Sequence, residues 1–318
     1  MAETNRELIT MGQFLRGGMT VCIVLVGVVL TNIGNVQAGR TSSARTPFSQ
    51  DELQPLMASL QAEGFPQDSL HRIFSDKRLR KVEHVVNLNA INRDDSRDYA
   101  QYLTPYALRK AKRFRRRNFG QLWRTEDQFG VPMNVVLAIL LVETQMGSAR
   151  LPFRVMDVFT TLVVEGHPDS LDRHFKRMRE LHPDLEREFL AERLTGKANW
   201  AFDELVALLS LGHQTGRDVL EIRGSYAGAL GLPQFLPTSY HRWAVDGNND
   251  SRVDLENRAD AIASIGNYLR AHGWTKDANY TQRRRAIWEY NHSPHYVEAV
   301  FAISRRLDLP SGKRIRRG

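Results

Sequence analysis

One carboxylate lies in an unusually apolar stretch of this chain. Residues 131–147 read VPMNVVLAILLVETQMG, and Glu143 is the only ionisable side chain among them. Pro132 suits the first turn of a helix and Gly147 the position just past its end, so the pattern predicts a helix that is buried on nearly every face. Burial disfavours the ionised form of an acid, so Glu143 is predicted to hold a proton near neutral pH. A structural ion pair with an arginine or lysine is the alternative explanation.

A second segment combines glycines with aromatic and uncharged polar side chains. Residues 224–240 read GSYAGALGLPQFLPTSY. Glycine lets the backbone approach a neighbour or a ligand closely, while Ser225, Gln234 and Ser239 offer hydrogen bonds without charge. The segment has neither the Gly-Lys-Ser/Thr of a phosphate-binding loop nor a strand-to-helix GxGxxG. We therefore predict a close-packed loop beside a site.

Oxygen-bearing side chains then recur with the spacing of a calcium loop. Asp246, Asn248 and Asp250 would occupy positions 1, 3 and 5 of such a loop. Arg252 would provide its backbone carbonyl at position 7. Ser251 replaces the usual turn glycine, and the twelfth position is an asparagine, although Asp260 could supply the late carboxylate. The spacing by itself is equally compatible with a plain polar turn.

Five blocks of sequence together resemble a known family. The blocks VETQMG, GSYAGALGLPQFLP, AVDGNNDSRVD, AIASIGNYLRAHGW and EYNHSPHY occur in the order found in the lytic murein transglycosylase B family. They extend from about Glu143 to Tyr296, with weaker similarity back to about Asp51. The family usually has an aromatic residue where this chain has Met146, so glycan contacts near the acid are expected to differ.

The resemblance implies a lysozyme-like catalytic core and a non-hydrolytic reaction. The bond cleaved would be the β-1,4 bond from N-acetylmuramic acid to N-acetylglucosamine in peptidoglycan, and the product a 1,6-anhydro sugar. Glu143 would be the sole catalytic residue, first as acid and then as base, with no cofactor needed for the chemistry. Ordinary glycosidases instead use two carboxylates about 5–9 Å apart. Asp157, Glu165 and Asp203 remain candidates for such a partner.

The resemblance also implies ligand contacts. It favours a structural Ca²⁺ at Asp246, Asn248, Asp250, Arg252 and Asp260 over a plain turn. Aromatic rings in or near the matched blocks could stack on sugars. The predicted substrate-binding residues are Ser225, Gln234, Tyr240, Tyr290, Asn291 and Tyr296.

The N-terminus has the pattern of an export signal. An apolar run over residues 19–34 is followed by Val36-Gln37-Ala38, a small-x-small pattern that predicts a cleaved signal peptide over residues 1–38 and a periplasmic location. The run is shorter than the ~20 residues that cross a bilayer, and an uncleaved anchor is the alternative. Cys22, the only cysteine, lies inside this run.

The remaining pattern is mostly helical. We predict a mainly α (α+β) fold in which a lysozyme-like core carries a small β-bearing insert with an EF-hand-like loop. Separate helices are expected near residues 185–194 and 200–212. The predicted regions are a linker over 39–50, a catalytic region over 51–310 with an N-terminal helical part at 51–120 and the insert at 224–258, and a basic tail at 311–318.

The formal charge of +8 is concentrated in clusters at residues 109–117, 283–285 and 313–317. Nucleic-acid binding is disfavoured because the signal peptide directs export and aromatics are not interleaved with the basic runs. Solvated helix faces or attraction to anionic peptidoglycan explain the charge. Expected partners are peptidoglycan glycan strands and, as a second class, other cell-wall enzymes, with membrane contact only through an uncleaved N-terminus.

Two other hypotheses remain open. A muramidase would hydrolyse the same bond with water, and a non-catalytic protein on the same fold would only bind glycan. Metalloprotease and serine-hydrolase chemistry is excluded, because the chain has no HExxH, no Cys/His zinc spacing and no Gly-x-Ser-x-Gly.

Overall fold

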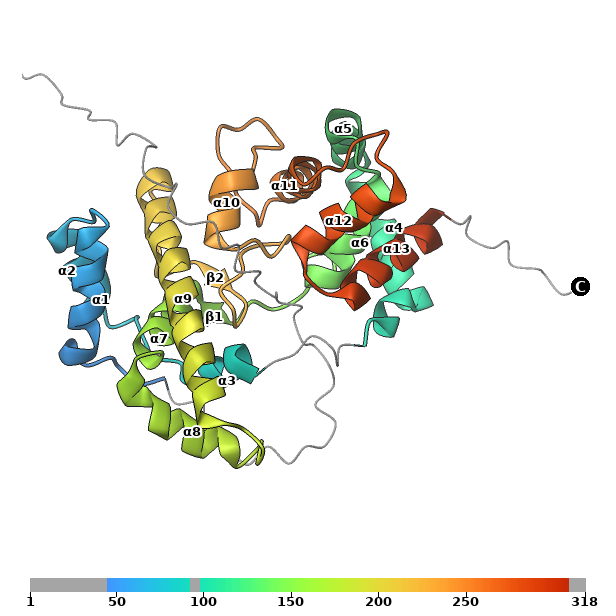
Figure 1. The fold of residues 1–318 in the computed structure, drawn as a ribbon. Helices are drawn as coiled ribbons and strands as arrows, with labels where there is room; N and C mark the ends of the chain where they lie inside the picture. The colour runs from blue at the N-terminus through green and yellow to red at the C-terminus, as the bar shows by residue number, and fades with distance from the viewer. Residues whose placement is uncertain (1–44, 92–97, 309–318) are drawn as a thin grey trace, which may run out of the picture.

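The computed structural model describes residues 45–91 and 98–308, and these residues are mainly helical (Figure 1). The predicted mainly α fold is confirmed. The predicted signal peptide and basic tail, and residues 39–44 of the predicted linker, lie outside the described residues. The helices are α1 (Gln50–Ala62), α2 (Gln67–Phe74), α3 (His84–Ile91), α4 (Pro105–Arg117), α5 (Phe119–Phe129), α6 (Met133–Thr144), α7 (Val155–Glu165), α8 (Leu171–Arg179), α9 (Arg187–Thr215), α10 (Pro237–Trp243), α11 (Arg258–Ala271), α12 (Tyr280–Tyr290) and α13 (Pro294–Asp308), with short 3₁₀ turns η2 (Ala100–Leu103) and η3 (Pro168–Ser170).

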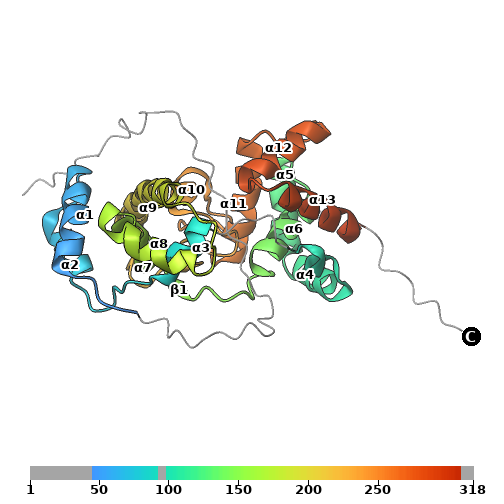
Figure 2. The ribbon, with the colours of Figure 1, turned by 60° about the horizontal axis from the view of Figure 1, so that its bottom comes forward.

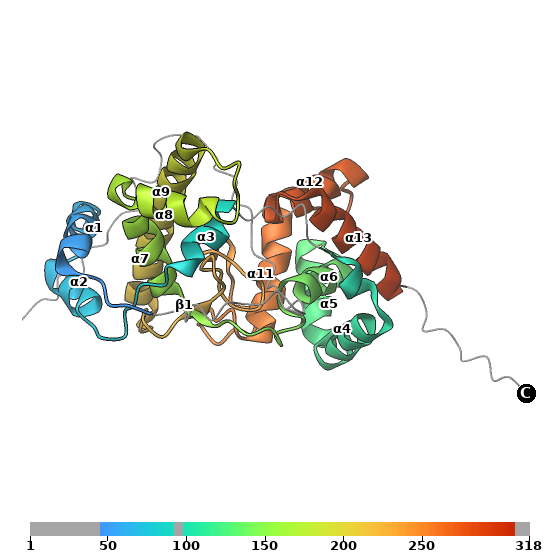
Figure 3. The same cartoon turned by 90° about the horizontal axis from the view of Figure 1, so that it is seen from below.

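The helices form two groups on either side of a central set of loops. Helices α1, α2, α7, α8 and α9 lie at one end, and α4, α5, α6, α12 and α13 lie at the other, in all three views (Figures 1, 2 and 3). Helix α7 packs along α9 in the first group, and α6 packs along α13 in the second. Helix α11 joins the second group to the loops by packing on α5.

Helix α6 is the centre of the second group. Every residue from Asn134 to Thr144 is buried, as its apolar sequence predicts. The helix ends at Thr144, earlier than predicted, because Gln145 and Met146 adopt left-handed backbone conformations before Gly147 does. The Thr144 hydroxyl donates to the Leu232 carbonyl at 3.0 Å, which ties this end of α6 to the glycine-rich loop.

The β-structure is small and involves the predicted insert. Strand β1 (Phe153–Arg154) pairs antiparallel with β2 (Arg223–Gly224), with Phe153 opposite Gly224. Isolated bridges from Leu230 to Gly224 and to Phe235 fold the glycine-rich segment onto itself. The segment after α6 and the insert are thus held side by side, although 70 residues of chain separate them.

The predicted pair of helices at 185–194 and 200–212 is wrong, because the structure has one 29-residue helix, α9. One face of α9 is buried on both sides of the polar residues in its middle. Its buried residues recur at helical spacing and include Leu190, Leu194, Ala201 and Leu205. Packing of this face on α7 therefore continues the helix through Gly196, where local propensity predicted a break.

A buried charge network fastens α1 to the α7–α8 corner. The Lys81 ammonium group bonds Glu165 at 3.0 Å and also bonds Glu52 of α1. His174 and Arg173 of α8 bind the same Glu165 carboxylate. Burial acts to raise the pKa of Glu165, but the hydrogen bonds from His174 and Lys81 outweigh it and lower the pKa to about 2. Glu165 is therefore ionised and structural.

Among the described helices, none is by itself long and apolar enough to cross a membrane. Helices α5 and α6 meet that criterion only as a pair bent by 116°.

Replacing Lys81 with Met should destabilise the fold by about 3–5 kcal/mol, because the buried Glu165 carboxylate loses a cation while remaining out of water. Urea unfolding measures the change. The control is Arg187→Met, which breaks an exposed pair with Asp172 and should cost only about 0–1 kcal/mol. Equal losses in the two variants would contradict the structural role of the buried network.

Candidate active site

Glu143 lies on the last turn of α6 with only 3% of its surface exposed. The Tyr296 hydroxyl, from α13, donates to Glu143 Oε1 at 2.7 Å, and Tyr296 itself is fully buried. The predicted apolar surroundings are present, since Val136, Ile139 and Leu140 are fully buried around the same helix. The site therefore places a desolvated carboxyl group beside a neutral donor.

Tyrosine rings build one wall around this carboxyl group. The rings of Tyr290 and Tyr296 stack with centroids 6.3 Å apart, and Tyr99 meets Tyr296 edge-on at 6.2 Å. Burial, reinforced by the negative charge of Glu143, raises the pKa of Tyr290 and of Tyr296 well above the usual value. Both hydroxyls therefore stay protonated donors. Tyr290 uses its own to hold the Pro233 carbonyl at 2.5 Å.

The glycine-rich loop packs tightly against its surroundings. Gly228 and Gly231 have positive φ of 77° and 61°. A Cβ on Gly228 would lie 2.2 Å from the ring of Phe159, and one on Gly231 would lie 2.5 Å from Leu255 Cβ. Only glycine permits both the backbone conformation and these approaches. The predicted close-packed loop is confirmed, and it is joined to the Glu143 end of α6 through Leu232.

Three of the predicted contact residues are buried in or next to this loop. Gln234 adopts a positive φ of 55° and donates to the Gly231 carbonyl, while its Oε1 accepts no hydrogen bond from the described residues. Ser225 Oγ accepts the backbone N–H groups of residues 227 and 229, so it also shapes the turn. Asn291 is buried at the C-terminus of α12, directly after Tyr290.

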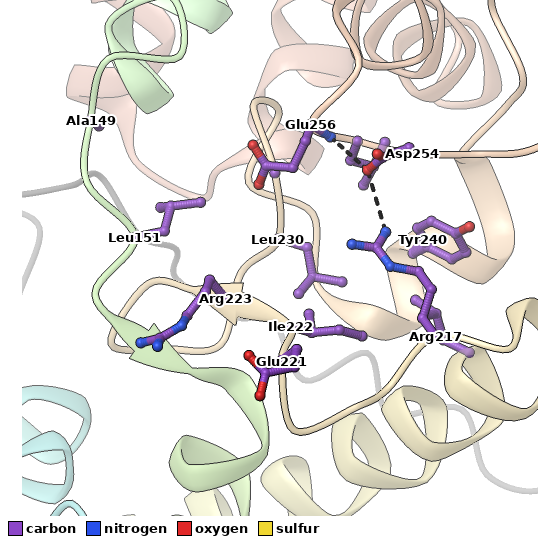
Figure 4. Close-up of a pocket in the computed structure, with 13 residues that line it drawn as sticks. Ala149, Leu151, Arg217, Glu221, Ile222, Arg223, Leu230, Tyr240, Asp254 and Glu256 are labelled. Atoms are coloured by element: carbon purple, nitrogen blue, oxygen red, sulfur yellow. Dashed lines mark hydrogen bonds and ion pairs between the residues drawn. The ribbon is translucent and has the colours of Figure 1, made fainter. Parts of the chain in front are cut away.

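Tyr240 faces a different part of the molecule. Its hydroxyl donates to the Val253 carbonyl at 2.8 Å, and the residue lines a cavity of about 390 Å³ together with Arg217 and Leu230 (Figure 4). Glu143 is not among the residues that line this cavity. Tyr290 and Tyr296 are likewise not among the residues that line it.

The three carboxylates considered as a second catalytic group make contacts elsewhere. Asp157 is fully buried at the start of α7 and accepts the backbone N–H of Arg80 at 3.0 Å. Glu165 belongs to the charge network with Lys81. Asp203 lies exposed on α9. Their helices, α7 and α9, belong to the opposite group from α6.

The sequence analysis missed Glu204. Its carboxylate is buried on α9 and accepts both the backbone N–H of Thr238, at 2.9 Å, and the Thr238 hydroxyl, at 2.7 Å, at the start of α10. Burial raises its pKa to about 7 in spite of these bonds. The sequence feature that could have identified Glu204 is its position one turn before Leu208, on the apolar face of α9.

The predicted metal loop is closed by its own hydrogen bonds. The Asp246 carboxylate accepts the four backbone N–H groups of residues 248–251. Asp250 bonds Asn248 and the backbone N–H of Arg252. The fully buried Asp260 accepts the N–H groups of Gly247 and residue 254. Within the described residues no three His, Cys, Asp or Glu side chains converge as a metal site, although the donor set of the loop is all oxygen.

The chain is similar to known envelope enzymes. A family model described as "Transglycosylase SLT domain" matches residues 49–284. Membrane-bound lytic murein transglycosylase B of Escherichia coli (strain K12) is 27% identical over 79% of this chain, and the chain spans 64% of that protein's length.

Solved structures share the fold. Lytic transglycosylase Slt35 of Escherichia coli, in complex with calcium, matches with a TM-score of 0.65 and 22% identity, over 83% of this chain and 95% of that chain. SltB3 of Pseudomonas aeruginosa, in complex with NAG-anhNAM-pentapeptide, matches with a TM-score of 0.64 and 21% identity, over 80% of this chain and 79% of that chain. The predicted lysozyme-like fold is therefore confirmed.

Replacing Glu204 with Gln should flatten the dependence of stability on pH. Because the folded-state pKa lies above the unfolded value of about 4.5, the folded state holds this proton more tightly. Stability is thus full below about pH 4.5 and falls as pH rises through about 7, by a total on the order of 3 kcal/mol. Urea unfolding from pH 4 to 8 measures the difference. Parallel pH profiles for the two proteins would contradict the raised pKa.

Proposed function

The chain belongs to the Transglycosylase SLT domain family, and from that premise we propose that it is a peptidoglycan lytic transglycosylase. It cleaves the β-1,4 bond from N-acetylmuramic acid to N-acetylglucosamine and leaves a 1,6-anhydromuramoyl end. The observation that carries the proposal is the desolvated Glu143 carboxyl group held by Tyr296. The family relative SltB3 has been solved with NAG-anhNAM-pentapeptide, which has this type of end.

In the proposed reaction one residue serves twice. Protonated Glu143 gives its proton to the glycosidic oxygen as the bond from that oxygen to C1 of the muramoyl sugar breaks. The oxygen of the sugar's 2-acetamido group stabilises the positive charge that develops at C1. The Glu143 carboxylate then takes the proton of the sugar's C6 hydroxyl, whose oxygen bonds to C1. The carboxyl group ends protonated, as it began.

The hydrogen bond from Tyr296 supports both steps. Because Tyr296 stays protonated, its hydroxyl can donate to Oε1 of Glu143 throughout the reaction. The bond also fixes the carboxyl plane, which a proton transfer at hydrogen-bond distance requires. The apolar residues of α6 keep water away from the carboxyl group.

The surroundings of the other carboxylates support a substrate-assisted reaction. Two-carboxylate glycosidases need a second acid that faces the first across the bond. Glu165 is neutralised by Lys81 and its neighbours on α8, and Asp157 bonds the backbone of Arg80. A muramidase that uses water would need a second catalytic carboxylate, and the contacts of Glu165 and Asp157 do not supply one.

We assign substrate contacts from the loop and the tyrosine wall. The unsatisfied Oε1 of Gln234 suits the N–H of an acetamido group, and Ser225, Tyr290 and Asn291 surround the same loop. Tyr296 acts through Glu143. Tyr240 would contact a more distant part of the ligand. The all-oxygen loop of Asp246, Asn248, Asp250, Arg252 and Asp260 would hold Ca²⁺ structurally, as suggested by the calcium complex of Slt35.

The predicted signal peptide would deliver the enzyme to the periplasm, where its substrate lies. In that compartment the main partner would be the glycan strands of peptidoglycan. Other cell-wall enzymes would be a second class of partner.

Glu143→Gln should lower the rate by about 10²–10⁴-fold, because the amide keeps the shape but has no acidic proton to transfer. Mass spectrometry of muropeptides released from purified sacculi measures both rate and product. Glu204→Gln is the matched control, since it changes a second buried glutamate outside the site and should retain activity.

Anhydro products from the parent chain and the control, but not from Glu143→Gln, are expected. Reducing-end products would instead indicate the muramidase. No release by a folded parent chain would indicate a glycan-binding protein.

Calcium should raise the melting temperature by several degrees, because a ligand that binds only the folded state stabilises it by about 2.7 kcal/mol at 100 times its Kd. Asp250→Asn should abolish the shift. Asp218→Asn, which changes an exposed carboxylate that pairs with Arg78 outside the loop, should retain it. Differential scanning calorimetry with calcium and with chelator makes the comparison. An unchanged melting temperature in the parent chain would remove calcium from the proposal.

A further inference from the structure

The C-terminal ends of α4 and α13 contact the N-terminal end of α6. Arg115, near the end of α4, donates to Asn134 at 3.2 Å, and Asn134 also bonds Asp308 at the end of α13. Helix α5 connects α4 to this same end of α6 (Figure 1). Helices α4, α5 and α13 belong to the second helix group, away from α1 and α2, in each view (Figures 2 and 3).

Exposed arginines gather at this end, where Asp127 of α5 and Asp308 of α13 are the exposed acidic residues. Arg113, Arg116 and Arg117 are exposed or half-exposed at the end of α4, a helix with no acidic residue, and within the described residues their side chains make no ion pair. Arg305 and Arg306 are exposed on the last turn of α13.

Two large aromatic side chains are exposed beside these arginines. Phe119 and Trp123 are 55% and 54% exposed, although the opposite side of α5 is well buried through Leu122 and Phe129. A spacing of four residues puts both rings on one face of the helix. Phe119 follows Arg117 by two positions, so the rings begin where the arginines of α4 end. Packing within the fold does not account for exposing them.

This surface is separate from the candidate active site. Asn134 and Glu143 are nine residues apart on α6, which is about 13 Å along the helix axis, and Glu143 lies at the other end. A partner bound at the outer end would therefore leave the carboxyl group accessible.

We propose that Arg113, Arg116, Arg117, Phe119 and Trp123, here called the α4–α5 surface, bind the anionic head groups of a phospholipid bilayer. Guanidinium groups pair with phosphate oxygens in a bidentate manner, and aromatic rings are favoured at the depth of the head groups. Exposed basic and aromatic side chains on two consecutive helices suit the charged interface of a bilayer, whereas a glycan strand is bound in a groove. The contact would be peripheral and additional to any N-terminal anchor.

The test uses residues 39–318, which contain every described residue but lack the apolar run at 19–34 that would itself bind lipid. Co-sedimentation with phosphatidylglycerol–phosphatidylcholine vesicles measures the affinity. Binding should fall at least tenfold when phosphatidylglycerol is omitted, and should weaken with salt. Equal binding to pure phosphatidylcholine would overturn the proposal.

Charge variants locate the surface. Arg116→Glu with Arg117→Glu should weaken vesicle binding at least tenfold. The control is Lys176→Glu with Arg179→Glu, which makes the same change of charge on exposed residues of α8 in the other helix group. Equal weakening by the two pairs would mean that net charge alone drives binding, and would overturn the proposal.

Aromatic variants test the rings in the same way. Phe119→Ser with Trp123→Ser should reduce vesicle binding, whereas Leu181→Ser with Phe189→Ser, which also removes two exposed apolar side chains, should not. Circular dichroism and activity on soluble glycan fragments verify that each variant is folded. Variants of the α4–α5 surface that lose binding to sacculi while keeping that to vesicles would identify peptidoglycan as the partner and overturn the proposal. Vesicle binding requires no catalysis, so it can fail or succeed independently of the proposed enzyme activity.

Discussion

The structure depends on keeping one carboxyl group out of water at the end of an apolar helix. Burying an acid is costly unless it is protonated or bonded to a donor. The Tyr296 hydroxyl is that donor, and it comes from a residue 153 positions away. It can reach Glu143 only because α13 packs along α6. The packing of the second helix group is therefore a condition for the chemistry proposed at Glu143, as well as a source of stability.

Buried glutamates in this protein differ because their neighbours differ. Glu165 touches Lys81, Arg173 and His174, so it is ionised and joins three elements. Glu204 bonds the N-terminus of α10 without a cation in contact, and its pKa is raised to about 7. Glu143 has tyrosines as its polar neighbours. Residue type and burial alone therefore do not identify a catalytic acid, because the contacts around each carboxylate decide its state.

The two ends of helix α6 contact different parts of the molecule. Its C-terminal end meets the glycine-rich loop and the tyrosine wall, while its N-terminal end meets the arginines of α4 and the end of α13. A straight helix holds these two ends at a fixed separation. If a bilayer binds the outer end, the rigid helix would orient the site away from the lipid and toward the polymer.

The sequence by itself determined the features that depend on nearby residues. Apolar composition predicted a buried helix around Glu143, and glycines predicted the tight loop around Gly228, because both follow from local backbone preferences and burial. Only the tertiary structure decided that α9 runs unbroken, that Tyr296 rather than Tyr240 reaches Glu143, and that Glu204 caps α10. Each depends on which helix faces meet, and contacts between residues far apart in the chain follow from packing of the whole molecule.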